Sequence, residues 1–217
     1  MTKRTQLLAA AIAMIAAQAA QADTVFWTDW TSKGPGVVSG TLSDGATSVG
    51  VTFTGAYSFA QTSGGTNYWA PNTPYLSATV SNAPPTSDIV ALNAGGTKTI
   101  TFSQTVHNPL IALVSWNGNH VSFAPGSNLQ YLSSGCGYWG CGSFSSKTST
   151  SFVGLGELHG VIMLEGDFTS ISFTDTSENW HGLTVGVVGV VPEPETYAMM
   201  LAGLGALGAV ARRRRES

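Results

Sequence analysis

The chain has 217 residues, of which 10% are charged and 43% hydrophobic, and its formal net charge is −3. Soluble domains usually carry about 25% charged residues, so this protein is poor in charge, and its 26 glycines make it rich in turn-forming residues. The composition argues against a nucleic-acid binder, which would carry a clustered basic face. It also argues against a disordered acidic chain, because nine Phe and six Trp need a core that buries them.

The N-terminus predicts a secretory signal peptide over residues 1–22. A short basic start precedes an apolar run from Leu7 to Ala17, and small residues follow up to Ala22. Basic, apolar and small-residue regions in this order are typical of signal peptides. The apolar run is shorter than the about 20 residues that span a bilayer. We therefore expect cleavage after Ala22, with an uncleaved N-terminal membrane anchor as the alternative.

Residues 23–191 predict one all-β domain, a β-sandwich or jelly roll, with a closed barrel as the alternative. Val49, Val51 and Phe53 alternate with small or polar residues, as in a half-buried strand, whereas residues 110–114 and 161–164 are continuous apolar runs. Turns rich in glycine and proline separate these segments, and no helical periodicity persists. Many short strands separated by turns are typical of sandwiches. Further strands are expected at residues 99–102, 171–173 and 183–187, where apolar residues alternate with small or polar ones, as on a sheet with one solvated face.

Aromatic residues in predicted loops are the candidates for carbohydrate binding. Residues 64–88 read as one long loop, and long loops in compact domains are often functional. Flat, apolar ring faces are suited to stacking against sugar rings. The alternative is that these rings fill the core or its rim. The candidates are Trp69, Tyr138, Trp139 and Trp180.

The two cysteines of the chain, Cys136 and Cys141, predict a structural disulfide. Exported proteins form and keep disulfides, and four intervening residues would close a small loop with Tyr138 and Trp139 at its tip. A redox pair or a metal clip is the alternative. Redox motifs usually have two residues between the cysteines, and no second cysteine pair is present to complete a zinc site.

No residue pattern indicates a catalytic or metal site, and we expect neither a cofactor nor a metal. The sequence has no HxH or HExxH pattern, no G-x-S-x-G elbow and no phosphate-binding loop. Acidic residues in two turns could hold calcium, and two glutamates are candidates for glycoside hydrolysis by residue type alone. The scattered histidines are His107, His120, His159 and His181. The possible calcium ligands are Glu165 with Asp167 and Asp175 with Glu178, and the candidates for hydrolysis are Glu157 and Glu165.

Residues 192–217 form a C-terminal segment with three parts. Two prolines in Val191-Pro192-Glu193-Pro194 make an extended entry, because proline does not fit a helix interior. Residues 196–211 carry no charge and predict a transmembrane helix, slightly below the usual length of about 17–25 residues. The arginine cluster after this segment would stay cytoplasmic, which would leave the domain of residues 23–191 outside the inner membrane. The cluster consists of Arg212, Arg213, Arg214 and Arg215.

This tail resembles the PEP-CTERM sorting signal of Gram-negative bacteria. The resemblance implies recognition near Pro192, Glu193 and Pro194 by an exosortase, a membrane cysteine protease-transpeptidase, in a host that makes exopolysaccharide. An unprocessed single-span anchor is the alternative. Such tails are also described as ice-binding protein C-terminal segments, a label that concerns the tail and does not predict ice binding. Residues 99–114 and 160–186 are similar to other exported PEP-CTERM proteins with β-sandwich bodies, which implies a fold but no activity.

Without its two ends the body is acidic. Residues 23–191 contain three lysines, no arginine and nine acidic residues, which gives a net charge of −6. Anionic polymers and nucleic acids are therefore not expected as direct partners. We expect a non-enzymatic exported protein that is tethered to the inner membrane before exosortase processing and then joins the cell envelope or extracellular matrix.

Binding of extracellular polysaccharide through the loop aromatics is a secondary expectation. The first alternative is a secreted polysaccharide-active enzyme, which would need a concave cleft with two carboxylates at catalytic separation. The second is an ice or surface adhesion protein, which would need a broad, flat face rich in threonine.

Overall fold

The computed structural model describes residues 22–43 and 47–188. The predicted transmembrane helix, the Pro-Glu-Pro motif and the arginine cluster lie outside the described residues, as does the predicted signal peptide except its last residue, Ala22. In the described part of the chain, no helix is long and apolar enough to cross a membrane.

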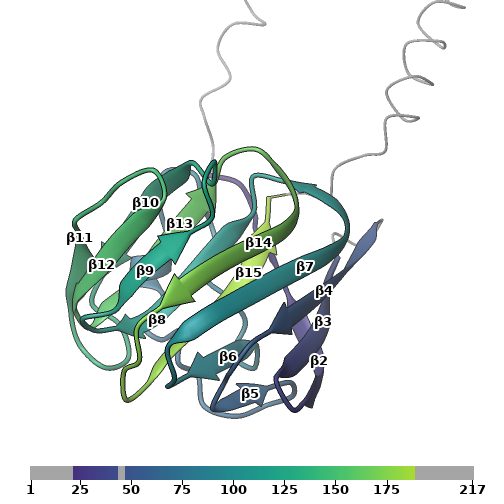
Figure 1. The fold of residues 1–217 in the computed structure, drawn as a ribbon, viewed down its shortest axis with the longest axis horizontal. Helices are drawn as coiled ribbons and strands as arrows, with labels where there is room; N and C mark the ends of the chain where they lie inside the picture. The colour runs from purple at the N-terminus through teal and green to yellow at the C-terminus, as the bar shows by residue number, and fades with distance from the viewer. Residues whose placement is uncertain (1–21, 44–46, 189–217) are drawn as a thin grey trace, which may run out of the picture.

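Across these residues the chain folds into two antiparallel sheets packed as a sandwich, which confirms the predicted all-β class (Figure 1). In the described ranges one sheet has seven strands in the order β10-β13-β8-β15-β6-β5, with β1 also paired to β15. Its strands are β1 (Phe26–Trp27), β5 (Phe59–Gln61), β6 (Ile89–Leu92), β8 (Leu110–Trp116), β10 (Leu129–Gly135), β13 (Leu158–Leu164) and β15 (His181–Val187).

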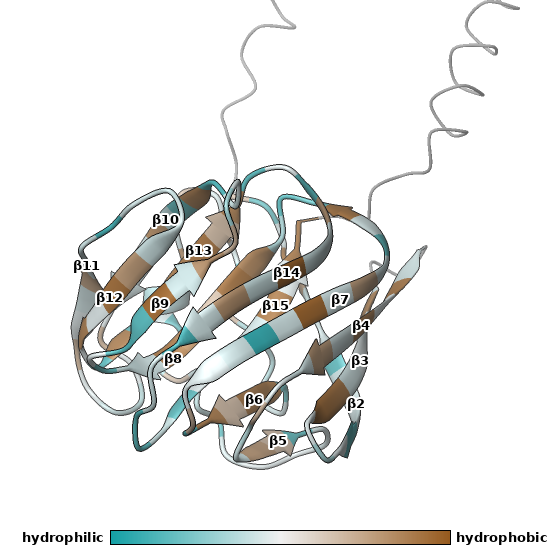
Figure 2. Cartoon of the chain, in the orientation of Figure 1, coloured by the Kyte–Doolittle hydropathy of each residue, from teal (hydrophilic) through white to brown (hydrophobic). Residues whose placement is uncertain are grey.

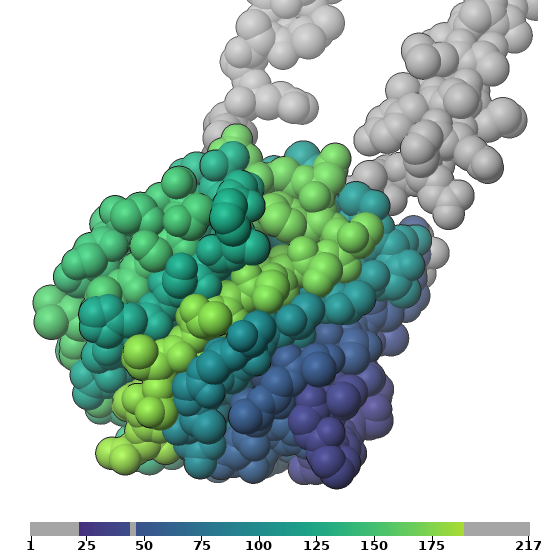
Figure 3. Space-filling model, viewed as in Figure 1, coloured from purple at the N-terminus to yellow at the C-terminus, as the bar shows by residue number. Residues whose placement is uncertain are grey.

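The second sheet has eight strands among the described residues, in the order β11-β12-β9-β14-β7-β4-β3-β2. In Figures 1 and 3, β14 and β7 run side by side across the middle of the face toward the viewer. The strands are β2 (Asp29–Gly34), β3 (Val37–Ser43), β4 (Ser48–Thr54), β7 (Gly96–His107), β9 (His120–Phe123), β11 (Gly142–Ser145), β12 (Ser151–Gly156) and β14 (Asp167–Asp175).

The eight-stranded sheet has one buried and one solvated face. In β4, Val49, Val51 and Phe53 are buried, and the residues between them are exposed or half-buried. Along β7, whose buried face also holds Lys98, Figure 2 shows hydrophobic residues separated by less hydrophobic ones. This is the pattern expected from side chains that point to opposite faces of a strand, and it confirms the half-buried strand predicted here.

The middle of the seven-stranded sheet is instead buried on both faces, as the continuous apolar run in β8 predicted, whereas its edge strand β10 is mostly half-buried or exposed. Every residue of β8 is buried. Ile111 and Leu113 belong to the core between the sheets, whereas Ala112 and Val114 belong to a second apolar cluster on the outer face of the same sheet.

The long loop between β5 and β6 covers this outer face. Tyr75, in the 3-10 helix η1 (Thr73–Tyr75), and Val80 are buried in the second cluster. Val80 also pairs with Asp23 in an isolated parallel bridge, which fastens the N-terminal segment to the loop. The loop was predicted correctly as a long loop, and much of it serves to bury a sheet face.

β15 differs from the half-solvated strand that its Thr and Gly positions predicted, because all of its residues are buried. The hydroxyl of Thr184 accepts a hydrogen bond from the indole nitrogen of Trp30 at 3.0 Å. Gly186 lies so close to Trp27 that a Cβ there would be 2.6 Å from the indole ring. Thr184 and Gly186 are therefore adapted to a packed interior, where a hydroxyl needs a partner.

Candidate functional site

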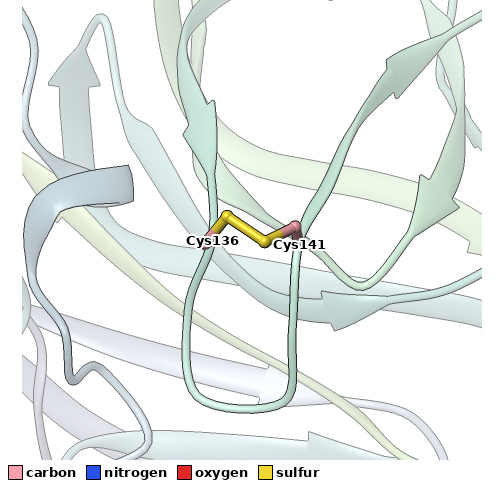
Figure 4. The surroundings of a disulfide bond; sticks show 2 residues. All are labelled: Cys136 and Cys141. Atoms are coloured by element: carbon pink, nitrogen blue, oxygen red, sulfur yellow. A yellow bond between two sulfur atoms is a disulfide. The ribbon is translucent and has the colours of Figure 1, made fainter.

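A disulfide joins Cys136 and Cys141 at the neck of the loop between β10 and β11 (Figure 4). The two cysteines also face each other as an antiparallel bridge. Inside the loop, the backbone N–H of Gly137 donates to the carbonyl of Gly140 at 2.8 Å. The predicted disulfide is confirmed, and it makes the loop a closed hairpin tip.

The loop presents two aromatic side chains to solvent. Tyr138 is 42% exposed and Trp139 is 54% exposed. Behind them, Gly137 packs on the ring of His159, and a Cβ at this position would lie 2.7 Å from Cε1 and closer still to two other ring atoms. The disulfide and this close packing together fix where the loop presents its rings.

His159 supports the loop from the interior. Its side chain is fully buried, and Nδ1 lies 3.0 Å from the hydroxyl of Tyr75. Burial lowers the pKa of His159 to about 4, against a smaller raising effect from the charge of Glu157. The imidazole is therefore neutral at physiological pH, and the loop rests on an uncharged ring.

Three separate segments bring four rings together in an aromatic patch of Tyr68, Tyr138, Trp139 and Trp180. The ring centroids are 5.2 Å apart for Tyr68 and Tyr138, and 4.9 Å apart for Tyr138 and Trp139. Trp180 lies 4.9 Å from Tyr68 and 6.1 Å from Trp139. These separations are typical of interacting aromatic pairs. Three of the four predicted carbohydrate-binding residues thus lie in one patch.

The fourth candidate, Trp69, does not belong to this surface. It is 1% exposed and packs at 5.2 Å from the ring of Tyr75 in the second apolar cluster. A ring that is covered on both faces cannot stack on a sugar, so its assignment as a stacking residue is corrected. Tyr68, the preceding residue in the loop, is the one that joins the patch.

Next to the patch is a cavity of about 310 Å³, which we call the acidic pocket. Among the described residues that line it there is no Lys, Arg or His. Its volume is at the lower end of the range for small-molecule sites. The lining includes Asn117, Trp139, Glu157, Glu178, Asn179 and Trp180.

Glu157, in the turn between β12 and β13, is held in place through both carboxylate oxygens. The hydroxyl of Ser115 donates to Oε2, and the side-chain amide of Asn117 donates to Oε1 at 2.9 Å. Ser115 itself is buried and has a positive φ of 57°. Left-handed backbone is uncommon outside glycine, and here it occurs at the residue that binds Glu157.

Glu178 is the second carboxyl group of the pocket, and its environment differs. Burial raises its pKa to about 7, the charge of Glu157 adds to this increase, and the backbone N–H of Asn117 opposes it. Its Oε2 atom is buried without a hydrogen-bond partner among the described residues. Near neutral pH this side chain is therefore divided between its acid and carboxylate forms.

Behind Glu178 runs a buried chain of polar and charged side chains, formed by His181, Asp175 and Lys98. His181 places Nδ1 at 3.5 Å from Oε2 of Glu178, and its Nε2 donates to Oδ2 of Asp175 at 2.9 Å. Asp175 accepts from the ammonium of Lys98 at 2.6 Å through its other oxygen. The side chains of Lys98, Asp175 and His181 are fully buried. Buried ions persist only when paired, and this chain connects the core to the pocket.

The remaining titratable candidates do not converge. His107 and Asp167 form an exposed pair at 2.7 Å, and Glu165 accepts from Gln130 at 3.2 Å. Among the described residues, no group of three or more His, Cys, Asp or Glu side chains is placed to hold a metal ion. The partner of Glu157 in the pocket is Glu178, a residue considered from the sequence only as a possible calcium ligand.

Comparison with known proteins bears on the C-terminal end of the chain. A model of the PEP-CTERM protein-sorting motif matches residues 190–215, which include the Pro-Glu-Pro motif and the arginine cluster. No curated protein and no solved structure matches the chain. The motif implies export, processing by exosortase and sorting to the cell surface. The chain therefore carries a PEP-CTERM protein-sorting motif at residues 190–215.

Proposed function

We propose that this cell-surface or matrix protein binds carbohydrate at the acidic pocket and has no catalytic activity. The observation that carries the proposal is the placement of Trp139 and Trp180 in the lining of a cavity that also holds Asn117 and Asn179. Ring faces stack on the apolar faces of sugars, and amides exchange hydrogen bonds with hydroxyl groups. The sorting motif also supports the proposal, because its resemblance to PEP-CTERM signals implies a host that makes exopolysaccharide.

The disulfide loop supports binding by reducing its entropic cost. Trp139 is more than half exposed, yet its loop is closed by a disulfide and rests on His159. Ordering a flexible side chain at an interface costs about 0.5–1.5 kcal/mol. A ring that is already held in place avoids part of this cost, as expected for a stacking platform.

A glycan array probed with the wild-type protein and with Trp139→Ala and Trp180→Ala tests the proposal. We expect saccharide signals that each substitution weakens by roughly tenfold or more, because truncating a tryptophan anchor at a binding site commonly costs about 2 kcal/mol or more, and about 1.4 kcal/mol is tenfold in affinity. Leu155→Ala is the control, since Leu155 is 62% exposed and does not line the pocket. An array without signals, or signals that survive both substitutions, would contradict the proposal.

Polysaccharide hydrolysis is the second candidate, and the carboxyl pair favours it. Glu157 and Glu178 line one cavity, and the pKa of Glu178 is raised to about 7, as for a general acid. Against a nucleophilic role, both oxygens of Glu157 already accept hydrogen bonds. Reducing-end release from array-positive polysaccharides distinguishes the two functions. Release that Glu178→Gln abolishes would establish an enzyme, and binding without release supports the binding protein.

A further inference from the structure

We infer that the acidic pocket selects an amino sugar, a saccharide that carries an ammonium group, over its N-acetylated counterpart. The inference rests on the proposed function and names its ligand class. It is carried by two carboxyl groups and two indole rings that line one cavity, with no basic residue among its described lining residues. Lys98, which is connected to the pocket through Asp175 and His181, is fully buried and paired with Asp175, so its charge is compensated in the interior.

The protein leaves the charge of the pocket incompletely compensated. Glu157 has two neutral donors, and Oε2 of Glu178 has no hydrogen-bond partner among the described residues. The polar atom that faces it, Nδ1 of His181, is 3.5 Å away and is itself buried without a hydrogen bond. This separation is too long for a strong hydrogen bond. Because Oε2 is itself buried, a cation in the pocket would stabilise the two carboxyl groups through the electrostatic field rather than by contact with this atom, and a neutral hydroxyl would not do so.

The rings favour the same ligand. An ammonium group is attracted to the face of an aromatic ring, and tryptophan gives the strongest such contact, worth about 0.5–2 kcal/mol. Trp139 and Trp180 line the cavity together with both carboxyl groups. A metal ion would not use the rings, and no group of three acidic, His or Cys ligands gathers among the described residues. An organic cation uses both the rings and the carboxylates.

The sugar part of the ligand is recognised by the asparagines. Asn117 and Asn179 line the cavity beside the acids, and both are exposed. Their amides can donate and accept, which suits the alternating hydroxyl groups of a sugar ring. A lysine side chain would present the ammonium alone, so a lysine peptide is the discriminating competitor.

Binding is expected to be coupled to the release of a proton. Glu178 faces Glu157 on one side and His181 on the other, with Asp175 and Lys98 behind His181. A bound cation favours the ionised carboxylate and lowers its pKa. Affinity for a permanently charged ligand therefore rises as the pH increases from about 5.5 to about 8, a window on either side of the pKa of about 7.

Isothermal titration calorimetry with three tetrasaccharides tests the inference: a glucosamine oligomer, its N-acetylated form and its N-trimethylated form. At a pH of about 6.5 we expect the glucosamine oligomer to bind at least about tenfold more tightly than the acetylated one, because hydrogen bonds to charged groups contribute about 1.5–3 kcal/mol. Glu178→Gln should remove most of this preference. Glu165→Gln, which makes the same charge change at an exposed site outside the pocket, should preserve it.

The trimethylated oligomer isolates the titration of the protein, because its own charge does not change with pH. Across the same pH window its affinity should rise in the wild type and stay level in Glu178→Gln. Equal affinity for charged and acetylated oligomers would overturn the inference and leave the proposed function standing. Absence of binding to any saccharide would overturn both. Trilysine binding as tightly as the glucosamine oligomer would also contradict amino-sugar selection.

Discussion

Gly137→Ala tests how the disulfide loop is held. A Cβ at this position would overlap the ring of His159, lying 2.7 Å from Cε1 and closer to Cγ and Nδ1. Neither partner can move easily, because the loop is closed by the disulfide and the ring is fully buried. Overpacking of this kind costs about 1–3 kcal/mol, which corresponds to a fall in Tm of about 2–12 °C for a domain of this size.

Chemical unfolding and calorimetry measure this cost, with Gly34→Ala as the matched control. Gly34 has open space where a Cβ would lie and no positive φ, so the same substitution there should change the free energy of unfolding by less than about 0.5 kcal/mol. In Gly137→Ala the tip should also shift, which weakens saccharide binding through Trp139. The control should bind like the wild type.

A double-mutant cycle identifies His159 as the obstacle. In a His159→Ala background the ring is absent, so Gly137→Ala should cost at least about 1 kcal/mol less than it does in the wild type. If Gly137→Ala were as stable as Gly34→Ala, or if its cost were unchanged in the His159→Ala background, this packing would not be what holds the loop.

Three further predictions concern the charges and the tail. The pKa of His159 falls from 6.5 to about 4 on folding, so the contribution of the neutral ring to the free energy of unfolding is complete above pH 6.5 and is lost as the pH falls toward 4, by up to roughly 3 kcal/mol. Denaturant unfolding of the wild type and of His159→Gln, from a pH of about 7 down to about 4, should show their stability difference shrinking by that amount. A difference that stays constant with pH would count against this assignment. Lys98→Met should lower the free energy of unfolding by about 3–5 kcal/mol, because it leaves Asp175 buried without its cation. The surface control Lys147→Met should lower it by less than about 0.5 kcal/mol. Similar unfolding midpoints for the two variants would contradict this prediction. Alanines at Pro192, Glu193 and Pro194, within the matched sorting motif, should leave an unprocessed precursor in the membrane fraction, as detected by its intact mass. Processing like that of the wild type would contradict sorting through this motif.

The fold class follows from local patterns in the sequence, but the coverage of the outer sheet face does not. Alternation in β4 and the apolar run in β8 predict their burial correctly. Trp69 reads as an exposed loop aromatic because burial by a loop has no sequence period. Trp69 is buried in the second cluster, which also contains side chains of β8 and β13, and these strands are distant from the loop in the chain.

The site is only partly predictable for the same reason. Tyr138 and Trp139 are marked by the cysteines beside them, but the cavity depends on the turn after β12 and the loop after β14, which are far apart in the chain. The burial of Lys98 and His181 could have been predicted from the sequence. Lys98 shares its strand face with Ile100, and His181 shares its face with Leu183, so period-two alternation places both side chains in the core.

Saccharide binding at the acidic pocket is tested most directly by a two-dimensional NMR titration of the indole N–H signals with the saccharides that the array identifies. The chain has six tryptophans, and Trp139 and Trp180 line the pocket, whereas Trp30 and Trp116 are buried and donate their indole N–H to protein oxygens. With Trp139→Phe and Trp180→Phe to assign the signals, we expect saturable shifts for these two tryptophans and none for Trp30 and Trp116. Signals that stay fixed, or shifts confined to other tryptophans, would contradict saccharide binding at this pocket.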